Sequence, residues 1–112
     1  MVETHKVQYT HSSRDDMRSM KKYILQKFHY HELGESFIKK MKRAERELAS
    51  CPAGYKDTGF LYRGYIVYAK SSQSYLFFFV VDKKEKVVTV LRVLQERMNW
   101  MYILKKWLKT NK

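Results

Sequence analysis

The apolar residues between positions 60 and 94 fall into three runs that have the composition and length of β-strands. The runs are residues 60–70 (FLYRGYIVYAK), 74–82 (SYLFFFVVD) and 86–94 (KVVTVLRVL). Only three residues separate each run from the next, whereas a parallel crossover needs about a dozen or more. The pattern therefore predicts an antiparallel meander, whose continuously apolar middle run is a strand covered on both faces.

Helical spacing dominates the first half of the chain, after a short candidate strand at residues 6–10. Residues 12–28 repeat apolar side chains every three or four positions. Residues 33–48 repeat the pattern and stop before Cys51-Pro52, because proline disfavours helix at the preceding residue. The connection between the two segments is short, so they are predicted to form an antiparallel helical hairpin.

The starts of the helices carry capping signals. Ser12, with Asp15 three residues later, resembles a capping box for the first helix, and Asn99 is a candidate cap for a last helix. The apolar stripe of this last helix consists of Trp100, Ile103, Leu104, Trp107 and Leu108. The order β-α-α-β-β-β-α defines an α+β fold, in which a helical hairpin and a C-terminal helix cover a small, mostly antiparallel sheet. The length predicts one domain over residues 1–112.

Strand alternation makes a prediction about the faces of the last strand. One face is predicted to carry Val87, Thr89, Leu91 and Val93, and the other Val88, Val90, Arg92 and Leu94. Arg92 is thus expected on an otherwise apolar face.

The charge of the chain indicates what kind of partner it binds. The formal net charge is +12, and residues 83–112 alone carry nine basic and two acidic side chains. A positive field of this size attracts polyanions or acidic proteins, so we expect a nucleic acid, an anionic surface or an acidic protein as partner. No run has the length of a signal peptide or membrane span, and the chain is expected to be cytoplasmic, with no membrane partner.

Common catalytic signals are missing from the sequence. It contains no Gly-rich phosphate loop, no G-x-S-x-G and no H-E-x-x-H. The single cysteine, Cys51, allows no internal disulfide and no cysteine cluster, and His29 with His31 is read as a pair of exposed turn residues. We therefore expect neither a cofactor nor a metal.

The remaining candidates for chemistry are basic and aromatic side chains of the meander and of the segment after it. Guanidinium groups bind phosphates and aromatic rings stack on bases, so such a set suits RNA or a phosphoryl-transfer transition state. The same side chains are also typical of a core edge or of a protein interface. The candidates are Arg63, Tyr65, Tyr68, Lys70, Arg92, Arg97 and Tyr102.

With these residues the chain resembles the RelE/ParE superfamily of toxins from bacterial type II toxin–antitoxin modules. The resemblance covers most of the chain: a strand, a helical hairpin, a Pro-x-Gly loop (Pro52 and Gly54), three strands and a last helix. Its most specific parts are residues 64–68 (GYIVY), 90–94 (VLRVL) and 95–100 (QERMNW), the last similar to the ParE-type ending. Gln95 and Asn99 stand where that ending commonly has histidine and aspartate.

The resemblance implies one of two actions. RelE-like members cleave mRNA on the ribosome, which would place Arg63, Arg92, Arg97 and Tyr102 in a nuclease site. ParE-like members poison DNA gyrase, and the target-binding candidates are then Arg97, Trp100, Lys105 and Lys106. Within residues 64–68 the inner arginine of the RelE pattern has no counterpart, and its second arginine falls at Glu96. The ParE-like branch is therefore expected, with mRNA cleavage, and so an enzyme, as the alternative and a non-toxic binding protein as a third option.

The resemblance also implies a partner. A cognate acidic antitoxin, partly disordered when free, would neutralise growth inhibition by folding onto a basic, apolar surface, such as the groove between the hairpin and the sheet. The expected assembly is a hetero-oligomer, of the kind that serves plasmid stabilization in this superfamily.

Overall fold

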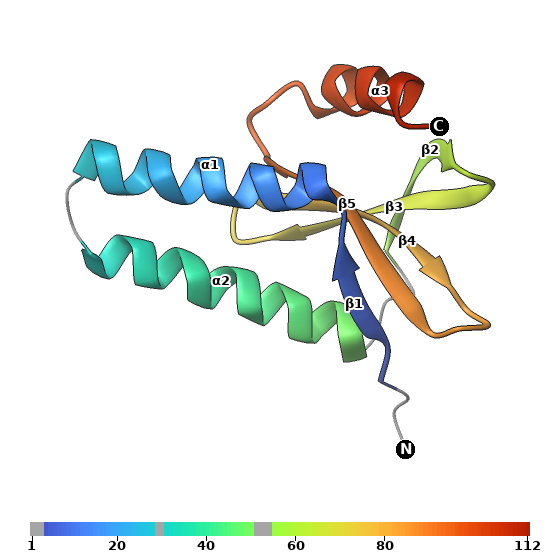
Figure 1. The fold of residues 1–112 in the computed structure, drawn as a ribbon, viewed down its shortest axis with the longest axis horizontal. Helices are drawn as coiled ribbons and strands as arrows, with labels where there is room; N and C mark the ends of the chain where they lie inside the picture. The colour runs from blue at the N-terminus through green and yellow to red at the C-terminus, as the bar shows by residue number, and fades with distance from the viewer. Residues whose placement is uncertain (1–3, 29–30, 51–54) are drawn as a thin grey trace.

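A five-stranded sheet carries two helices on one face and a third helix on the other (Figure 1). The structure is a computed structural model, and it describes residues 4–28, 31–50 and 55–112. In chain order the elements are β1 (Lys6–Tyr9), α1 (His11–Phe28), α2 (His31–Ser50), β2 (Lys56–Tyr62), β3 (Tyr65–Ser72), β4 (Tyr75–Asp82), β5 (Val87–Gln95) and α3 (Trp100–Thr110). The predictions made for His29, Cys51, Pro52 and Gly54 lie outside the described residues.

The strand order is β1-β5-β4-β3-β2. The short β1 runs parallel to β5, and every other neighbouring pair is antiparallel. The predicted α+β class, with a helical hairpin and a C-terminal helix on a mostly antiparallel sheet, is confirmed.

Over the described residues the structure has one strand more than the predicted order β-α-α-β-β-β-α. The run at residues 60–70 contains a tight turn at Arg63-Gly64, so it comprises the end of β2 and most of β3. The backbone φ angles of Arg63 and Gly64 are 49° and 85°. Two consecutive positive φ angles are the signature of a type I′ hairpin turn, which favours Asn-Gly or Gly-Gly. Arginine in the first position concealed the turn within an apolar run.

Gly64→Ala should lower the free energy of unfolding by about 1 kcal/mol, because an L side chain is strained in the left-handed region. Nothing lies within 4 Å of a Cβ built on Gly64, so crowding adds no cost. Urea unfolding followed by circular dichroism measures the change. An unfolding free energy that stays within about 0.5 kcal/mol of the parent, the range of ordinary surface substitutions, would contradict the turn assignment.

The helical hairpin packs closely on the first face of the sheet. Its buried side chains Phe37, Met41, Ala44 and Leu48 pack on strand residues of the same cluster. These strand residues are Phe77, Phe79, Val88, Val90 and Val93. The core therefore fills the space between the hairpin and the middle of the sheet, and a groove of the kind that we expected lies where α1 meets the end of β5.

The cap of α1 is Thr10 rather than Ser12. The Thr10 hydroxyl accepts a hydrogen bond from the Ser13 amide at 3.1 Å, and the Ser13 hydroxyl donates to the Thr10 carbonyl at 2.9 Å. The first of these bonds satisfies a free helix-end N–H as an N-cap does, whereas the second goes to the carbonyl that also accepts from the Arg14 amide. Ser12 instead lies inside the helix, where its hydroxyl accepts from the indole N–H of Trp107 at 2.8 Å. The start of α1 is thereby tied to α3.

α3 covers the second face of the sheet, and its predicted apolar stripe is confirmed. Leu104 is fully buried, and the other stripe residues pack against the same cluster. The predicted cap is also present, because the Asn99 side chain accepts from the Tyr102 amide at 3.4 Å.

β5 contains an irregularity that reverses the predicted faces. Phe78 pairs with Arg92 while Phe79 pairs with Val90, so Leu91 is an extra residue at a β-bulge. Val93 therefore joins Val88 and Val90 on the hairpin face, and Leu91 and Leu94 lie on the α3 face. The alternation predicted for the last strand is wrong beyond Leu91, because the bulge shifts the phase by one residue.

Candidate functional site

Arg92 is bound by a carboxylate of α1. Its Nε donates to Asp16 Oδ2 at 2.7 Å and its Nη2 donates to Asp16 Oδ1 at 2.8 Å, with side-chain exposures of 17% for Arg92 and 15% for Asp16. This is the bidentate arrangement in which arginine and carboxylate bind most strongly. The guanidinium group of Arg92 is therefore engaged inside the protein, and the sequence did not indicate that Asp16 is its partner.

The position of Asp16 follows from the shortness of β1. β1 pairs with β5 only from Val87 to Val90, so the outer edge of β5 needs other partners after that point. The Thr10 hydroxyl donates to the Leu91 carbonyl at 2.7 Å, and Asp16 Oδ2 accepts from the Val93 amide at 3.0 Å. Side chains at the start of α1 thus replace the missing strand.

The turn between β5 and α3 is fixed by backbone bonds and presents Arg97. The Met98 amide donates to the Gln95 carbonyl at 3.1 Å, and the Glu96 amide donates to the Ser74 carbonyl at 2.9 Å. The Glu96 carboxylate also accepts a hydrogen bond from the Ser71 hydroxyl. Between these anchored positions Arg97 is exposed, and its Nε donates to Gln95 Oε1 at 3.1 Å. A rigid turn therefore carries an accessible guanidinium group.

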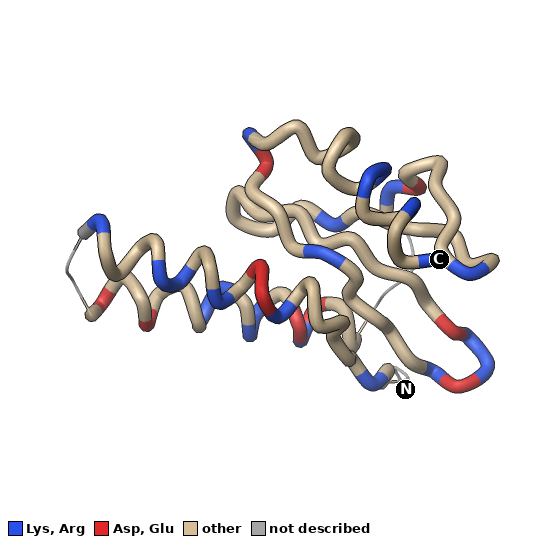
Figure 2. Tube along the Cα trace, turned by 45° about the horizontal axis from the view of Figure 1, so that its top comes forward, with Lys and Arg blue, Asp and Glu red and all other residues tan. Residues whose placement is uncertain are grey.

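The predicted target-binding residues of α3 divide between its two faces. Trp100 is partly buried and packs on Phe78, with ring centroids 5.3 Å apart. Tyr102, Lys105 and Lys106 lie on the exposed face, where Tyr102 is 62% exposed. α3 contains no acidic residue, and its basic positions are visible near the C-terminus in Figure 2. Arg97, Tyr102, Lys105 and Lys106 therefore belong to one accessible basic segment, which we call the C-terminal surface.

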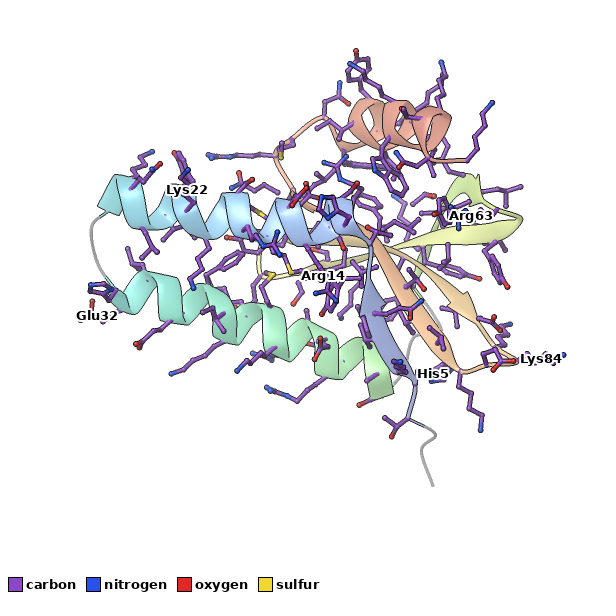
Figure 3. All side chains as sticks on the ribbon, viewed as in Figure 1. His5, Arg14, Lys22, Glu32, Arg63 and Lys84 are labelled. Atoms are coloured by element: carbon purple, nitrogen blue, oxygen red, sulfur yellow. The ribbon has the colours of Figure 1, made fainter. Side chains whose placement is uncertain are left out.

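Arg63 lies at the other end of the sheet. It directly follows β2 and lies two residues before Tyr65, the first residue of β3. The Tyr65 hydroxyl donates to Asp82 at the end of β4, and Asp82 pairs with the first residue of β5. Arg97 follows the last residue of β5, so the nine-residue strand, roughly 30 Å long at ~3.4 Å per residue, lies between them. Figure 3 shows Arg63 at the β2–β3 turn. The structure does not bring the four nuclease candidates together.

The side chain of Arg63 extends an aromatic stack. Its guanidinium carbon lies 5.0 Å from the ring centroid of Tyr62, and that ring stacks on Trp107 at 5.5 Å with an interplanar angle of 25°. This contact joins the β2–β3 turn to the end of α3 and gives Arg63 a structural role.

Lys70 is buried on the hairpin face of the sheet. Its ammonium group lies 2.7 Å from Glu47 Oε2 and 4.7 Å from the ring centroid of Tyr55. The hydrogen bond from Lys70 holds the pKa of Glu47 below its usual value. Lys70 thus connects α2 to β3 and faces away from the C-terminal surface.

A groove adjoins the C-terminal surface, between the helical hairpin and the end of β5. It has a volume of about 490 Å³ and lies between α1 and the segment from the end of β5 to the start of α3. Tyr23 lines it, and the pKa of Tyr23 is lowered because the Lys27 ammonium donates to its hydroxyl at 2.9 Å, with a further contribution from the charge of Arg97. Tyr23 and Arg97, far apart in sequence, therefore border the same groove.

Among the described residues, no three His, Cys, Asp or Glu side chains are grouped closely enough to hold a metal ion. No helix in this part of the chain has the length and apolar character of a membrane span.

A helical hairpin and a single C-terminal helix on opposite faces of a mostly antiparallel sheet, ending in a basic segment, define the RelE/ParE class of small toxins. Residues 7–100 match the family described as the ParE toxin of the type II toxin–antitoxin system parDE, and the chain belongs to this family.

Solved structures share this fold at low sequence identity. A chain of the chromosomal ParDE system from P. aeruginosa has a TM-score of 0.64 and 12% identity, with 83% of this chain and 97% of that chain covered. A chain of the RelBE2 toxin–antitoxin complex from Mycobacterium tuberculosis has a TM-score of 0.59 and 18% identity, with 85% and 93% covered. A mutant of the E. coli toxin RelE in its free state has a TM-score of 0.58 and 16% identity, with 92% and 97% covered. No curated protein sequence matches the chain significantly.

Proposed function

We propose that this protein is the toxin of a type II toxin–antitoxin module and inhibits growth by ParE-like inhibition of DNA gyrase. Membership of the ParE family supports the first part. The second part, inhibition of DNA gyrase rather than cleavage of mRNA, is supported by the separation of the nuclease candidates. Arg92 is bound by Asp16, and the length of the sheet lies between Arg63 and Arg97. A phosphoryl-transfer site needs its charged groups to converge on one scissile phosphate.

The C-terminal surface is the proposed contact with the target. Its cations are exposed, its backbone is fixed by the 95–99 turn, and the packing of Trp100 on Phe78 holds the start of α3 on the sheet. Exposed arginine and tyrosine beside a rigid turn are typical anchors of protein interfaces. The partner that neutralises the toxin is an acidic antitoxin in a cytoplasmic hetero-oligomer.

Two assays with purified protein test the target. In the first, gyrase supercoils relaxed plasmid in the presence of the toxin; in the second, ribosomes translate a defined mRNA in its presence. Loss of supercoiling with intact mRNA supports the proposal. Cleavage of translated mRNA with unimpaired supercoiling would establish the RelE-like alternative, and no effect in either assay would identify a binding-only member.

Tyr102→Phe should leave growth inhibition unchanged, because the substitution removes only a hydroxyl group and keeps the ring that a protein target would contact. Colony counts after tightly induced expression measure the effect. Tyr65→Phe, which removes the hydroxyl that donates to Asp82 at the other end of the sheet, is the matched control. Loss of toxicity in Tyr102→Phe alone would indicate that the hydroxyl takes part in chemistry and would favour nuclease action.

A further inference from the structure

One side of α1 carries a group of cations that neither the core nor the C-terminal surface uses. Met17, Met20 and Ile24 pack on the hairpin core and define the inner face of the helix. Outside this inner face lie four basic residues, which we call the α1 basic row: Arg14, Arg18, Lys21 and Lys22. Figure 3 labels Arg14 and Lys22, the two ends of the row.

The α1 basic row has a regular spacing. Arg14, Arg18 and Lys22 are four residues apart, so they follow one another along the helix at steps of about 6 Å, four times the helical rise of ~1.5 Å. All three are exposed, and the half-buried Lys21 lies beside this line. Phosphates along one strand of a nucleic acid are also evenly spaced, at distances of the same order. The row therefore fits a phosphate backbone.

A hollow of about 510 Å³ lies against the α1 basic row and has a polar, cationic lining of Arg18, Lys21, Lys22 and Gln26, with Leu25 as its apolar member. Among the described residues, neither a carboxylate nor an aromatic ring lines it. Leu25 is engaged inside the protein, because a Cβ built on Gly34 of α2 would lie only 2.9 Å from Leu25 Cδ2. The hollow thus offers cations and an amide but no free apolar anchor.

Two acids lie close to the α1 basic row, and each has a partner. Asp15 pairs with Arg18 at 3.4 Å, but both side chains are more than half exposed, and such pairs contribute little, so a phosphate can compete for the guanidinium group. Glu45 shares a small hollow with Arg14 and accepts a hydrogen bond from the Tyr9 hydroxyl at 2.6 Å. No carboxylate among the described residues pairs with the two lysines of the row. The positive charge of the row is therefore available to an anion.

We infer that the α1 basic row binds the phosphate backbone of duplex DNA without reading its base sequence. Cations alone are sufficient for such binding, because backbone contacts supply affinity and carry no direct sequence information. An anionic membrane holds a helix through an apolar face, and single strands are held through aromatic stacking; the hollow offers neither. This activity goes beyond the proposed function, and it would bring the toxin to the DNA on which gyrase acts.

The test is a fluorescence-polarisation titration of a labelled DNA duplex with the full-length protein, without gyrase and over a range of salt concentrations. The expected result is saturable binding, equal for two unrelated base sequences. The logarithm of the affinity should fall with the logarithm of the salt concentration with a slope of about −3.6, which is about −0.9 for each of four phosphates. Absence of saturable binding at low salt would overturn the inference. Equal or tighter binding of polyglutamate, of anionic vesicles or of a single-stranded oligonucleotide would also overturn it.

Two charge-matched double variants locate the site. Lys21→Gln/Lys22→Gln removes two cations of the row, and Lys83→Gln/Lys84→Gln removes two exposed lysines from the β4–β5 turn. Figure 3 shows Lys22 and Lys84 at opposite ends of the molecule. Glutamine has nearly the helix propensity of lysine, so α1 should be retained, and circular dichroism checks this.

Lys21→Gln/Lys22→Gln should weaken duplex binding about tenfold or more and make the salt slope shallower by about 2, because two phosphate contacts are lost. Lys83→Gln/Lys84→Gln should bind like the parent. Equal weakening in the two variants would mean that net charge alone attracts the DNA, and the α1 basic row would then not be a site. Loss of binding only in Lys105→Gln/Lys106→Gln would place the duplex on the C-terminal surface and equally overturn the inference.

These measurements are separate from the test of the proposed target. A protein that binds the duplex through the α1 basic row but does not inhibit supercoiling would keep the DNA-binding site and disprove gyrase as the target. A protein that inhibits supercoiling but does not bind the duplex in the absence of gyrase would keep the proposed function and overturn the α1 basic row as a DNA-binding site.

Discussion

Asp16→Ala is expected to lower the free energy of unfolding by about 3 kcal/mol, the size of effect seen when one partner of a buried ion pair is removed. The substitution leaves the Arg92 guanidinium, 17% exposed at its side chain, without its carboxylate. It also leaves the Val93 amide without its acceptor at the sheet edge. Both losses act on β5, the strand that pairs with both β1 and β4. Urea unfolding monitored by circular dichroism measures the change.

Asp15→Ala is the matched control for this prediction. Asp15 is the neighbouring residue on α1; its side chain is 52% exposed and pairs with His11 and Arg18 on the same helix. Exposed pairs contribute about 0–1 kcal/mol, so this variant should unfold close to the parent. The double variant Asp16→Ala/Arg92→Ala should be less destabilised than the sum of the two single variants, because neither charge is then left unpaired. Equal effects of Asp15→Ala and Asp16→Ala would show that the ion pair has no special role.

Periodicity predicted the helical elements and the antiparallel meander, because the buried side of each element sets the pattern of apolar residues. The stripe of α3 repeats at the helical period, and its members pack on one face of the sheet around Leu104. The middle strand is apolar at successive positions, and Phe77, Phe78 and Phe79 are all fully buried between helices on the two faces. The spacing of apolar residues indicates which side of a helix or strand is buried, and this side can be predicted from the sequence alone.

Backbone irregularities were the features that periodicity could not reveal. The Arg63-Gly64 turn lies inside an apolar run, and the bulge at Leu91 lies inside the strand that contains Arg92. Each depends on a local φ or pairing register that a neighbouring strand imposes. A single inserted residue changes the face of every later side chain, so Val93 and Leu94 exchanged their predicted sides.

The sequence predicted which residues after the last strand belong to the candidate site, but not which residues of α1 lie beside them. Arg97, Lys105 and Lys106 follow from the position of positive charge after the last strand. Asp16 and Tyr23 are separated from this segment by most of the chain, and the parallel pairing of β1 with β5 places α1 beside it. Long-range packing therefore determines that Arg92 is bound by Asp16 inside the protein and that Arg97 is exposed to a partner.

Arg97→Ala is expected to abolish growth inhibition while the fold stays intact. Arg97 is exposed, its Nε donates to the side chain of the nearby Gln95, and the 95–99 turn is held by backbone bonds that do not involve its guanidinium group. Exposed substitutions of this kind change stability by about 0.5 kcal/mol or less. If Arg97 anchors the target, truncation should cost at least about 2 kcal/mol of binding, or roughly thirtyfold in affinity. Colony counts after induced expression and the gyrase supercoiling assay measure the loss.

Arg46→Ala is the control, because it removes the same charge from an exposed position on α2. It should inhibit growth like the parent, since the helical hairpin lies on the opposite face of the sheet from α3. Lys105→Ala and Lys106→Ala should each produce a smaller loss than Arg97→Ala, because a lysine contributes a point charge where arginine offers a planar, multidentate donor. An Arg97→Ala protein that unfolds would show that the residue is structural. One that is folded and still inhibits gyrase would remove Arg97 from the target contact and leave the exposed lysines of α3 to make it.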